Sequence, residues 1–384
     1  MSFPRSLIVF IISIIGLISG YYQYPHKGIH EQFEGSIPFI WNRNFNLTVC
    51  QYCDARPSPS VLLIGGGYKS GKSRLIEMIS KEKIESGRFV IKFDAGIADS
   101  LEDLLVTLKL AMSKAIINVE SYGLTPALIK SAEKLSGRTI SGGVSEATSA
   151  LYKIFESDID GMLVDESKFS TTRITKLFDD LEEISDYLNP IIFVHNFDSI
   201  RRLKSSKFLD IADKALKVLG SYVSRRNNYE QSIPIILEIK NSLELLNLRE
   251  LDTYRYFEVT KLDNVIHHYV IENQAFSLSQ LKKITSIFGA HAGSIAKIYN
   301  DMKYNIKLDE SINLEIKKLE KIITSKINLQ DSNITKMFCT KSTLSDISTL
   351  EKYKALFEEG FLYLSKSLDI KIANKAIKRI LCNK

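Results

Sequence analysis

The chain has 384 residues, of which 45% are hydrophobic and 25% are charged, and its formal net charge is +6. This length allows one large domain or two modest ones with a sizeable core, and the four cysteines are too few and too scattered for a disulfide framework. Lysines and glutamates alternate through most helical segments, so composition excludes a protein that binds nucleic acid through a basic tail or arm.

The first segment with a clear signal is the N-terminus. Residues 6–25 carry no charge, and the run 7–19 is almost entirely apolar. A helix of about 18 residues rises about 27 Å, which is close to the thickness of the hydrocarbon core of a bilayer. Tyrosines follow the run, where amphipathic rings favour the membrane interface. We therefore expect residues 1–25 to form a single-pass anchor. A cleaved signal peptide is the alternative, although the small residues around Gly20 fit its cleavage site poorly.

A C-x-x-C pair follows at Cys50 and Cys53. This spacing occurs in redox motifs and in half of a tetrahedral zinc site. No second C-x-x-C pair and no nearby histidine pair completes the coordination. The sequence therefore predicts no metal site at these cysteines.

A phosphate-binding loop is the most specific motif of the chain. The stretch from Gly66 to Ser73 matches G-x-x-x-x-G-K-[ST]. The apolar run "SVLLIGG" before it is typical of a buried parallel strand, and "KSRLIEMISKEKI" after it has helical periodicity. Strand, glycine loop and helix are the arrangement that places backbone N–H groups and a helix N-terminus at a phosphate. The predicted nucleotide-binding residues are Gly66, Gly67, Ser70, Gly71, Lys72, Ser73 and Arg74.

Each residue type has a physical role in this loop. Gly66 and Gly71 let the backbone wrap around the phosphates, and Lys72 supplies a positive charge to the β- and γ-phosphates. Ser73 offers a hydroxyl to Mg²⁺. The loop therefore predicts ATP and Mg²⁺ as the cofactors.

Strand and helix patterns alternate after the loop. Strands are expected at 87–96, 190–200, 233–242 and 254–263, with a helix from about residue 199 to 226. This alternation predicts an α/β fold, in which a parallel sheet is covered by helices on both faces. Residues after about 264 show no strand signal and are expected to be helical.

From about residue 35 to about 305, the order of elements resembles the AAA+ and signal-transduction (STAND) ATPases, in particular the archaeal-type ATPase and origin-recognition branch. The resemblance rests on the phosphate loop (Walker A), on "YRYFEVTKLD" as the last core strand, and on "SIFGAHAGSIAKIYNDM" in the place of the lid glycine segment. It implies a three-layer P-loop NTPase sandwich, an all-helical lid and a C-terminal helical region. The expected division is an anchor at 1–25, a P-loop core at 26–263, a lid at 264–305 and a helical region at 306–384.

The chain departs from that family at its Walker B strand. Where the family has an Asp-Glu pair, this sequence has His195 and Asn196. Losing both acids removes a magnesium ligand and a general base, which predicts weak hydrolysis. Asp198 is the substitute metal ligand and catalytic residue that we predict. An alternative acidic motif is Asp165-Glu166, although its apolar run is short for a central strand.

The resemblance also implies roles for three further polar residues. Asn241 would act as a sensor beside the phosphate loop, although a helix N-cap explains it equally well. Arg225, with Arg226, would act as an arginine finger for a neighbouring subunit, with a solvated helix end as the alternative. The lid lacks the arginine often found there and has His291 and Lys297 instead.

The sequence thus predicts a membrane-anchored AAA+/STAND-like ATP-binding protein, a nucleotide-dependent switch or remodelling ATPase. The alternative is a pseudo-ATPase scaffold that binds ATP without turnover and regulates a partner. Expected partners are a membrane through residues 6–25 and a homo-oligomer or protein partner, and no nucleic acid is expected. The predicted location is an organelle membrane, such as the mitochondrial or endoplasmic reticulum membrane, with the nucleotide domain on the ATP-containing side.

Overall fold

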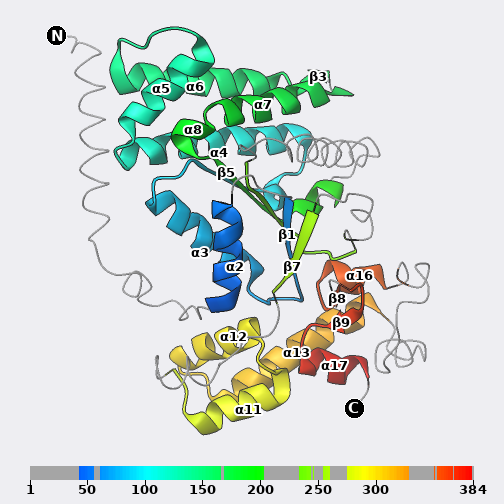
Figure 1. The fold of residues 1–384 in the computed structure, drawn as a ribbon. Coiled ribbons are helices and arrows are strands. Elements are labelled where there is room, and N and C mark those ends of the chain that lie inside the picture. Colours follow the sequence, from blue (N-terminus) through cyan, green and yellow to red (C-terminus); the bar gives the residue numbers. More distant parts are fainter. Residues whose placement is uncertain are drawn as a thin grey trace, which may run out of the picture.

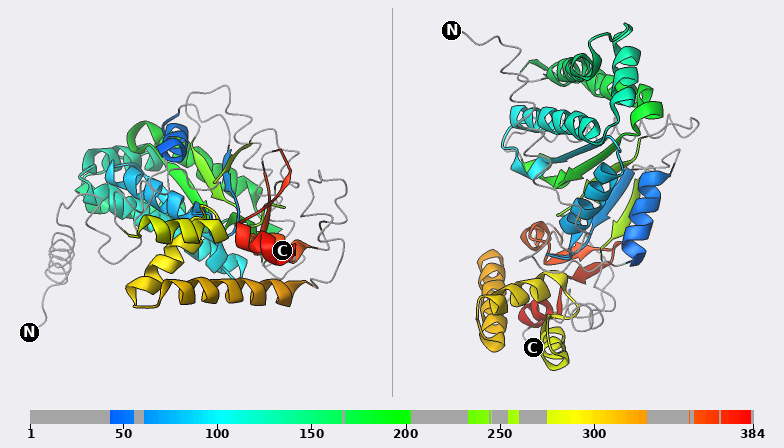
Figure 2. Two further views of the ribbon diagram at one scale, coloured as in Figure 1. Left: turned by 90° about the horizontal axis from the view of Figure 1, so that it is seen from below. Right: turned by 90° about the vertical axis from the view of Figure 1, so that its left-hand side faces the viewer.

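A computed structural model describes residues 43–55, 61–165, 168–202, 233–243, 245, 254–259, 275–327, 350, 353–365 and 367–382. A central sheet lies between a thick helical layer on one side and the lid and C-terminal elements on the other (Figure 1). Two further views show the same arrangement (Figure 2).

The central sheet is fully parallel. Its strands are β1 (Val61–Gly65), β2 (Val90–Asp94), β5 (Ile191–His195), β6 (Ile235–Glu238) and β7 (Tyr254–Glu258), in the order β2-β5-β6-β1-β7. Register pairs Asp94 with His195 and Ile64 with Glu238, so the carboxyl ends of neighbouring strands meet at one edge. The predicted α/β fold of P-loop NTPases is confirmed, and β1, the strand that carries the phosphate loop, lies between β6 and β7.

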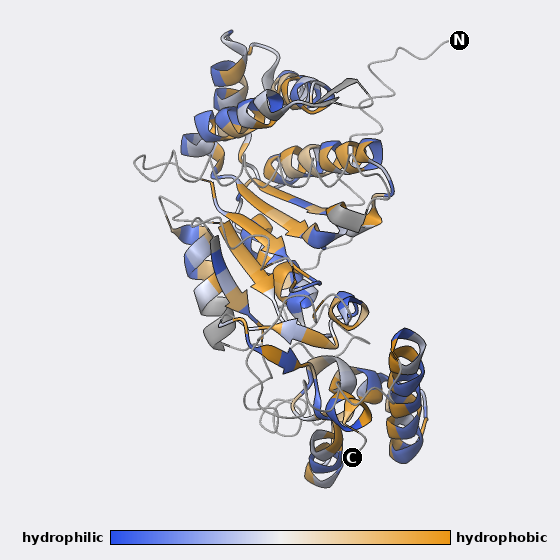
Figure 3. Cartoon of the chain, turned by 90° about the vertical axis from the view of Figure 1, so that its right-hand side faces the viewer, coloured by the Kyte–Doolittle hydropathy of each residue, from blue (hydrophilic) through white to orange (hydrophobic). Residues whose placement is uncertain are grey.

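Both faces of this sheet are buried. Along β1, Leu62 and Ile64 pack with helices α2 (Arg43–Asp54) and α3 (Lys72–Glu85), while Val61 and Leu63 join the larger core on the opposite face. Successive side chains of a strand point to opposite faces, so a strand covered on both sides must be apolar throughout. The inner strands β1, β5 and β6 are accordingly buried along their whole length, and much of the central sheet is coloured as hydrophobic in Figure 3.

Helix α4 (Leu101–Ser121) covers the second face and contacts both β2 and α6 (Gly143–Asp160). The other helices of this layer are α5 (Thr125–Ser136), α7 (Thr171–Glu183) and α8 (Ser185–Leu188), and a short 3-10 helix, η2 (Ala95–Ile97), precedes α4. Side chains of Ser100 and Ser170 cap the N-termini of α4 and α7, where the first N–H groups have no partner within the helix.

The second acidic motif of the sequence lies in this helical layer. Strands β3 (Leu163–Asp165) and β4 (Lys168–Phe169) form an antiparallel hairpin that is separate from the central sheet. In Figure 1, β3 lies beside α7, away from the carboxyl end of β1. The alternative assignment of Asp165 to the Walker B strand is therefore wrong, because that strand belongs to the central sheet.

Beyond the sheet lie α11 (Leu278–Phe288) and α12 (Ala292–Lys303), which fall within the predicted lid, and α13 (Leu308–Lys326), which falls within the predicted C-terminal region. Ser277 and Gln280 form a reciprocal capping box at the start of α11. Buried residues of all three helices, such as Ile284, Ile295 and Leu319, belong to the same core as the sheet face that α4 covers. The lid therefore packs continuously with the nucleotide domain.

The C-terminal elements differ from the expectation of helices alone. Helices α16 (Lys354–Glu358) and α17 (Lys375–Leu381) flank an antiparallel hairpin of β8 (Leu362–Leu364) and β9 (Ile370–Ile372). Each strand has three residues, which is too short for any periodicity to distinguish a strand from a helix. The hairpin is stabilised by tertiary burial, since β8 is fully buried.

Two further expectations fall partly or wholly on residues that the structure does not describe. Of the helix expected at about 199–226, the structure describes only its start, the 3-10 helix η3 (Phe197–Arg202). The proposed anchor at 1–25 also lies outside the described residues. Among the residues that are described, no helix is both long enough and apolar enough to cross a membrane.

Candidate nucleotide site

The loop between β1 and α3 has the backbone of a phosphate cradle. Gly66 and Gly71 adopt φ values of 143° and 104°, a backbone conformation that residues with a side chain rarely adopt. A Cβ at Gly66 would also lie 2.5 Å from the carbonyl oxygen of Val259. Gly71 is the N-cap of α3 and provides no side-chain cap to the first turn. The N–H groups of that turn therefore remain available to an anion.

Lys72 lies across this loop. Its Nζ donates to the carbonyl oxygens of Gly66 and Gly67, each at 3.0 Å. Burial lowers the pKa of Lys72 to about 8, and the negative charges of Glu238 and Asp198 oppose that decrease. A phosphate placed in the loop would give this ammonium group a charged partner in place of two carbonyls.

Ser70 and Arg74 complete the predicted loop set. Ser70 is buried, and its Oγ has no hydrogen-bond partner among the described residues. A buried hydroxyl without a partner is unfavourable, so this atom is suited to a ligand oxygen. Arg74 lies on the first turn of α3 and is partly exposed.

Ser73 forms a hydrogen bond with Glu238, an acid that was not among the predicted site residues. Its Oγ donates to Glu238 Oε1 at 2.5 Å, and Glu238 Oε2 lies 2.7 Å from Nδ1 of His195. Glu238 is the last residue of β6 and is 2% exposed. The sequence contained one signal for it, since a glutamate ends the apolar run "IPIILE".

His195 and Asn196 point to different partners. Nδ1 of His195 faces Glu238, and its Nε2 is buried without a hydrogen-bond partner among the described residues. Asn196 adopts φ 49° and donates from Nδ2 to Asp94 at the end of β2. Of this pair, His195 is therefore directed toward the strand next to the phosphate loop.

Asp198 is 3% exposed and accepts two backbone hydrogen bonds. Oδ1 accepts from the N–H of Lys240 at 2.8 Å, and Oδ2 accepts from the N–H of Asn241 at 2.9 Å. The Oδ1 atom of Asn241 in turn accepts from the N–H of Leu243. These bonds hold the turn that follows Glu238. The catalytic and metal roles predicted for Asp198, and the sensor role of Asn241, stay predictions.

The lid contacts the phosphate loop directly. Nε2 of His291, at the N-cap of α12, bonds to the carbonyl oxygen of Tyr68, and the N–H of Gly293 donates to the carbonyl oxygen of Lys69 at 3.1 Å. Because Nδ1 of His291 accepts from the N–H of Ser294, Nε2 is the donating nitrogen. Burial lowers the pKa of His291 to about 4, so the ring is neutral at pH 7.

The C-terminal hairpin contacts the same loop from another side. The N–H of Tyr68 donates to the carbonyl oxygen of Gly360 at 2.6 Å, and its ring packs edge-on against Phe361. A Cβ at Gly67 would lie 2.8 Å from the Cβ of Ala373. Residues 67–69 are therefore enclosed by the lid and the C-terminal elements.

The other predicted site residues lie elsewhere. Lys297 forms an ion pair with Asp301 on its own helix. Arg225 and Arg226 lie outside the described residues, so the arginine finger stays a prediction. Lys69, which was not predicted, lies 3.6 Å from Glu315 of α13 and adds an ionic contact between the loop and that helix.

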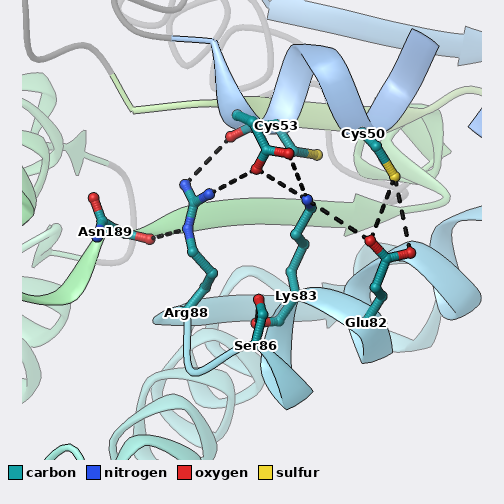
Figure 4. A network of polar contacts seen from close by, with 8 residues as sticks. Cys50, Cys53, Glu82, Lys83, Ser86, Arg88 and Asn189 are labelled. Atoms are coloured by element: carbon teal, nitrogen blue, oxygen red, sulfur yellow. Dashed lines mark hydrogen bonds and ion pairs between the residues drawn. The ribbon is translucent and has the colours of Figure 1, made fainter. Parts of the chain in front are cut away.

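The C-x-x-C pair is part of the packing between α2 and α3. Lys83 and Arg88 bind the carboxylate of Asp54, and the thiol of Cys50 lies 3.8 Å from Glu82 (Figure 4). Burial raises the pKa of Cys50 to about 11 and that of Cys53 to about 12, so both remain protonated thiols. Thiolates are the reactive and metal-binding form. This network is structural.

The donor set fits a magnesium nucleotide. Mg²⁺ is usually held by one or two protein oxygens together with phosphate oxygens and waters, not by a dense cage of side chains. Ser73 and Glu238 provide such oxygens beside the loop. Among the described residues, no group of three or more histidine, cysteine, aspartate or glutamate side chains forms an alternative metal site.

No protein-family model and no curated protein matches the sequence. Among solved structures, the chain is similar to a Walker-type ATPase of Pyrococcus abyssi, with 12% identity over 89% of this chain and 96% of that one and a TM-score of 0.55. It also matches the Drosophila origin recognition complex bound to GC-rich DNA and Cdc6, with 13% identity over 88% of each chain. The TM-score of 0.25 for that match supports no inference. The chain thus has a fold similar to that of this Walker-type ATPase.

Proposed function

We propose that this protein is an ATP-binding switch of the AAA+/STAND type, in which the phosphate loop passes its nucleotide state to the lid and the C-terminal hairpin. The contact of residues 67–69 with both elements carries the proposal. The N–H of Tyr68 donates to the carbonyl oxygen of Gly360, and its carbonyl oxygen accepts from Nε2 of His291. A γ-phosphate that moves the backbone of Tyr68 would therefore also disturb its hydrogen bond to Gly360 or to His291.

Switching requires a difference in free energy between the ATP-bound and ADP-bound states. Lys72 already donates to the carbonyl oxygens of Gly66 and Gly67, so phosphate would replace these two contacts. Those carbonyls belong to the loop whose next residue contacts the lid. The coupling path is thus one short stretch of backbone.

Slow turnover is part of the proposal. β5 ends in His195 and is followed by Asn196, and neither residue brings the negative charge of a Walker B pair. The same observation favours the second candidate, a pseudo-ATPase scaffold that binds ATP without turnover. The two candidates differ in whether any magnesium-dependent hydrolysis occurs.

The membrane and the assembly state belong to the same proposal and rest on the sequence. The uncharged run 6–25 supports attachment to an organelle membrane, and Arg225 supports a homo-oligomer whose subunits share a nucleotide. A protein partner is the alternative to the oligomer. No nucleic-acid partner is proposed.

ATP titration of the full chain, with and without the Lys72→Ala substitution, tests the function. We expect micromolar binding by the wild type and a loss of at least about 100-fold in the variant, because Lys72 contacts the phosphates of nucleotide in this loop type. Lys81→Ala, on the same helix and paired with Glu85, is the matched control and should bind normally. Equal binding by all three proteins would contradict the proposal.

A second measurement separates a switch from an inert binder. Hydrogen exchange at His291, Gly293, Gly360, Phe361 and Ala373 should differ between the ATP-bound and ADP-bound protein, because these residues contact the loop. Phosphate release in the presence of Mg²⁺ then distinguishes slow ATPase from scaffold. Identical exchange with both nucleotides would exclude the switch.

A further inference from the structure

The carboxyl ends of β5 and β6 present an acid on an unexpected strand. β6 lies between β5 and β1 in the sheet, so a side chain at its end is closer to the phosphate loop in strand order than one on β5. Glu238 occupies that end. Its two oxygens join Ser73 of the loop to His195 of β5.

Other acids at this edge have different partners. Asp94, at the end of β2, accepts from the N–H of Gly96 and from Asn196. Asp198 accepts from the N–H groups of Lys240 and Asn241. Within the described part of the chain, Glu238 is thus the strand-end acid that contacts the magnesium-binding serine of the loop.

The cost of burying Glu238 calls for a compensating role. A carboxylate that is 2% exposed is unfavourable unless charge or hydrogen bonds offset its desolvation. Its partners are a hydroxyl on an exposed residue, Ser73, and the ring of His195, and its charge also acts on Lys72. A divalent cation beside Ser73 would supply the missing positive charge.

We propose that Glu238 is the magnesium-organising acid of this protein, displaced by one strand from the Walker B position of β5. This inference rests on the proposed nucleotide binding. His195 is a positioning residue: its Nδ1 hydrogen bond holds Oε2 of Glu238, which leaves Oε1 directed to Ser73 and the ion's ligand shell.

The test is the effect of Mg²⁺ on ATP affinity of the full chain, measured by calorimetry in Mg²⁺ and in EDTA. For the wild type, Mg²⁺ should strengthen ATP binding. Glu238→Gln keeps the size of the side chain and an acceptor for Ser73, so ATP affinity in EDTA should be retained. We expect its magnesium enhancement to fall by about 10- to 100-fold, as for loss of a ligand or its supporting contact.

Two variants make the result specific. Asp94→Asn removes the same charge from the end of a neighbouring strand and should keep the enhancement. His195→Asn retains a donor near the position of Nδ1 and should keep most of it, whereas His195→Leu should lose it. Mn²⁺ electron paramagnetic resonance with ADP present should show the same ranking through the fraction of bound metal. Thermal unfolding of each variant verifies that it folds.

Each outcome decides the proposal. A Glu238→Gln protein that folds and keeps the full magnesium enhancement overturns it, as does a wild type that binds ATP with no magnesium enhancement. Loss of the enhancement in Asp198→Asn but not in Glu238→Gln would also overturn it and assign the ion to Asp198. A wild type that binds no ATP in either buffer would instead contradict the proposed function itself.

Discussion

The carboxyl end of β1 and the carboxyl ends of β5 and β6 form two halves of one site, and they are built differently. At β1, the residues that shape the loop are consecutive, and their geometry follows from glycine positions and from the start of α3. At β5 and β6, His195 and Glu238 are separated by 43 residues and meet only because their strands pair.

A sequence motif therefore identifies the first half of the site more reliably than the second. A phosphate loop is recognisable because backbone conformation restricts residue type locally. An acid that organises a metal only has to reach the right place, and two neighbouring parallel strands end at the same edge of the sheet. Chemistry at the second half can therefore change strands without changing the fold.

The largest effect on stability and ATP binding is expected from a substitution in the phosphate loop after β1. Gly66→Ala places a Cβ 2.5 Å from the carbonyl oxygen of Val259 at φ 143°. We expect a loss of about 3 kcal/mol in the free energy of unfolding from backbone strain and a loss of ATP binding, measured by urea unfolding and by titration. Gly123→Ala is the control, since it also has positive φ but nothing within 4 Å, and it should keep ATP binding. Normal nucleotide binding by Gly66→Ala would show that the loop tolerates another backbone path.

A smaller loss of stability is expected from removing the hydrogen bonds of Asp198, which hold the turn after β6. In Asp198→Asn, an NH₂ group replaces one of the two carboxylate oxygens that accept from the N–H groups of Lys240 and Asn241. One of these N–H groups then faces a donor and loses its hydrogen bond. We expect about 2 kcal/mol of destabilisation in urea, because a buried donor loses its partner. ATP binding in EDTA should remain, since these bonds fix the turn after β6 and not the loop. A variant as stable as the wild type would show that Asp198 has no structural role there.

The contact between loop and lid predicts a pH dependence. The pKa of His291 is lowered to about 4 from 6.5, so the unfolded chain binds the proton more readily than the folded one. The stability from this neutral ring is therefore complete above about pH 6.5 and decreases as pH falls toward 4. Over the range from pH 6.5 to 5, the decrease should be up to about 2 kcal/mol.

A variant isolates that contribution. Asn is also a good N-cap, so His291→Asn should keep the start of α12 while removing the titrating ring. Urea unfolding at several pH values should then show a shallower decrease in acid for the variant than for the wild type. Parallel curves would mean that His291 does not carry the pH dependence.

These comparisons show how far sequence reasoning extends. The positions of the core strands along the chain and the phosphate loop could be predicted because continuous apolar runs and a glycine-rich motif are local signals. The hairpin of β8 and β9 could not, since three-residue strands carry no periodicity. The placement of Tyr68 between Gly360 and His291 depends on tertiary packing across most of the chain.

Glu238 illustrates the same limit at the site. In the sequence it is a glutamate at the end of a strand, followed by Asn241, which attracts attention as a sensor. Its importance becomes visible only through register, since Glu238 pairs with Ile64 of β1 and so lies level with the start of the loop. A search for acids restricted to β5 selects Asp198, which instead binds the backbone of the next turn.

The smallest effect is expected from substituting Asp165. A variant without effect would show that the acids of the site come from the central sheet alone. Asp165 ends β3 in a hairpin beside the helical layer, outside the central sheet. Because β3 is not part of the sheet that carries the site, Asp165→Asn should change ATP affinity, magnesium enhancement and turnover by less than about twofold, as is usual for substitutions away from a site. The measurement is the same calorimetric titration used for Glu238→Gln, carried out side by side. A loss of magnesium enhancement in Asp165→Asn would mean that the hairpin moves to the loop when nucleotide binds, and the acid would then come from neither β5 nor β6.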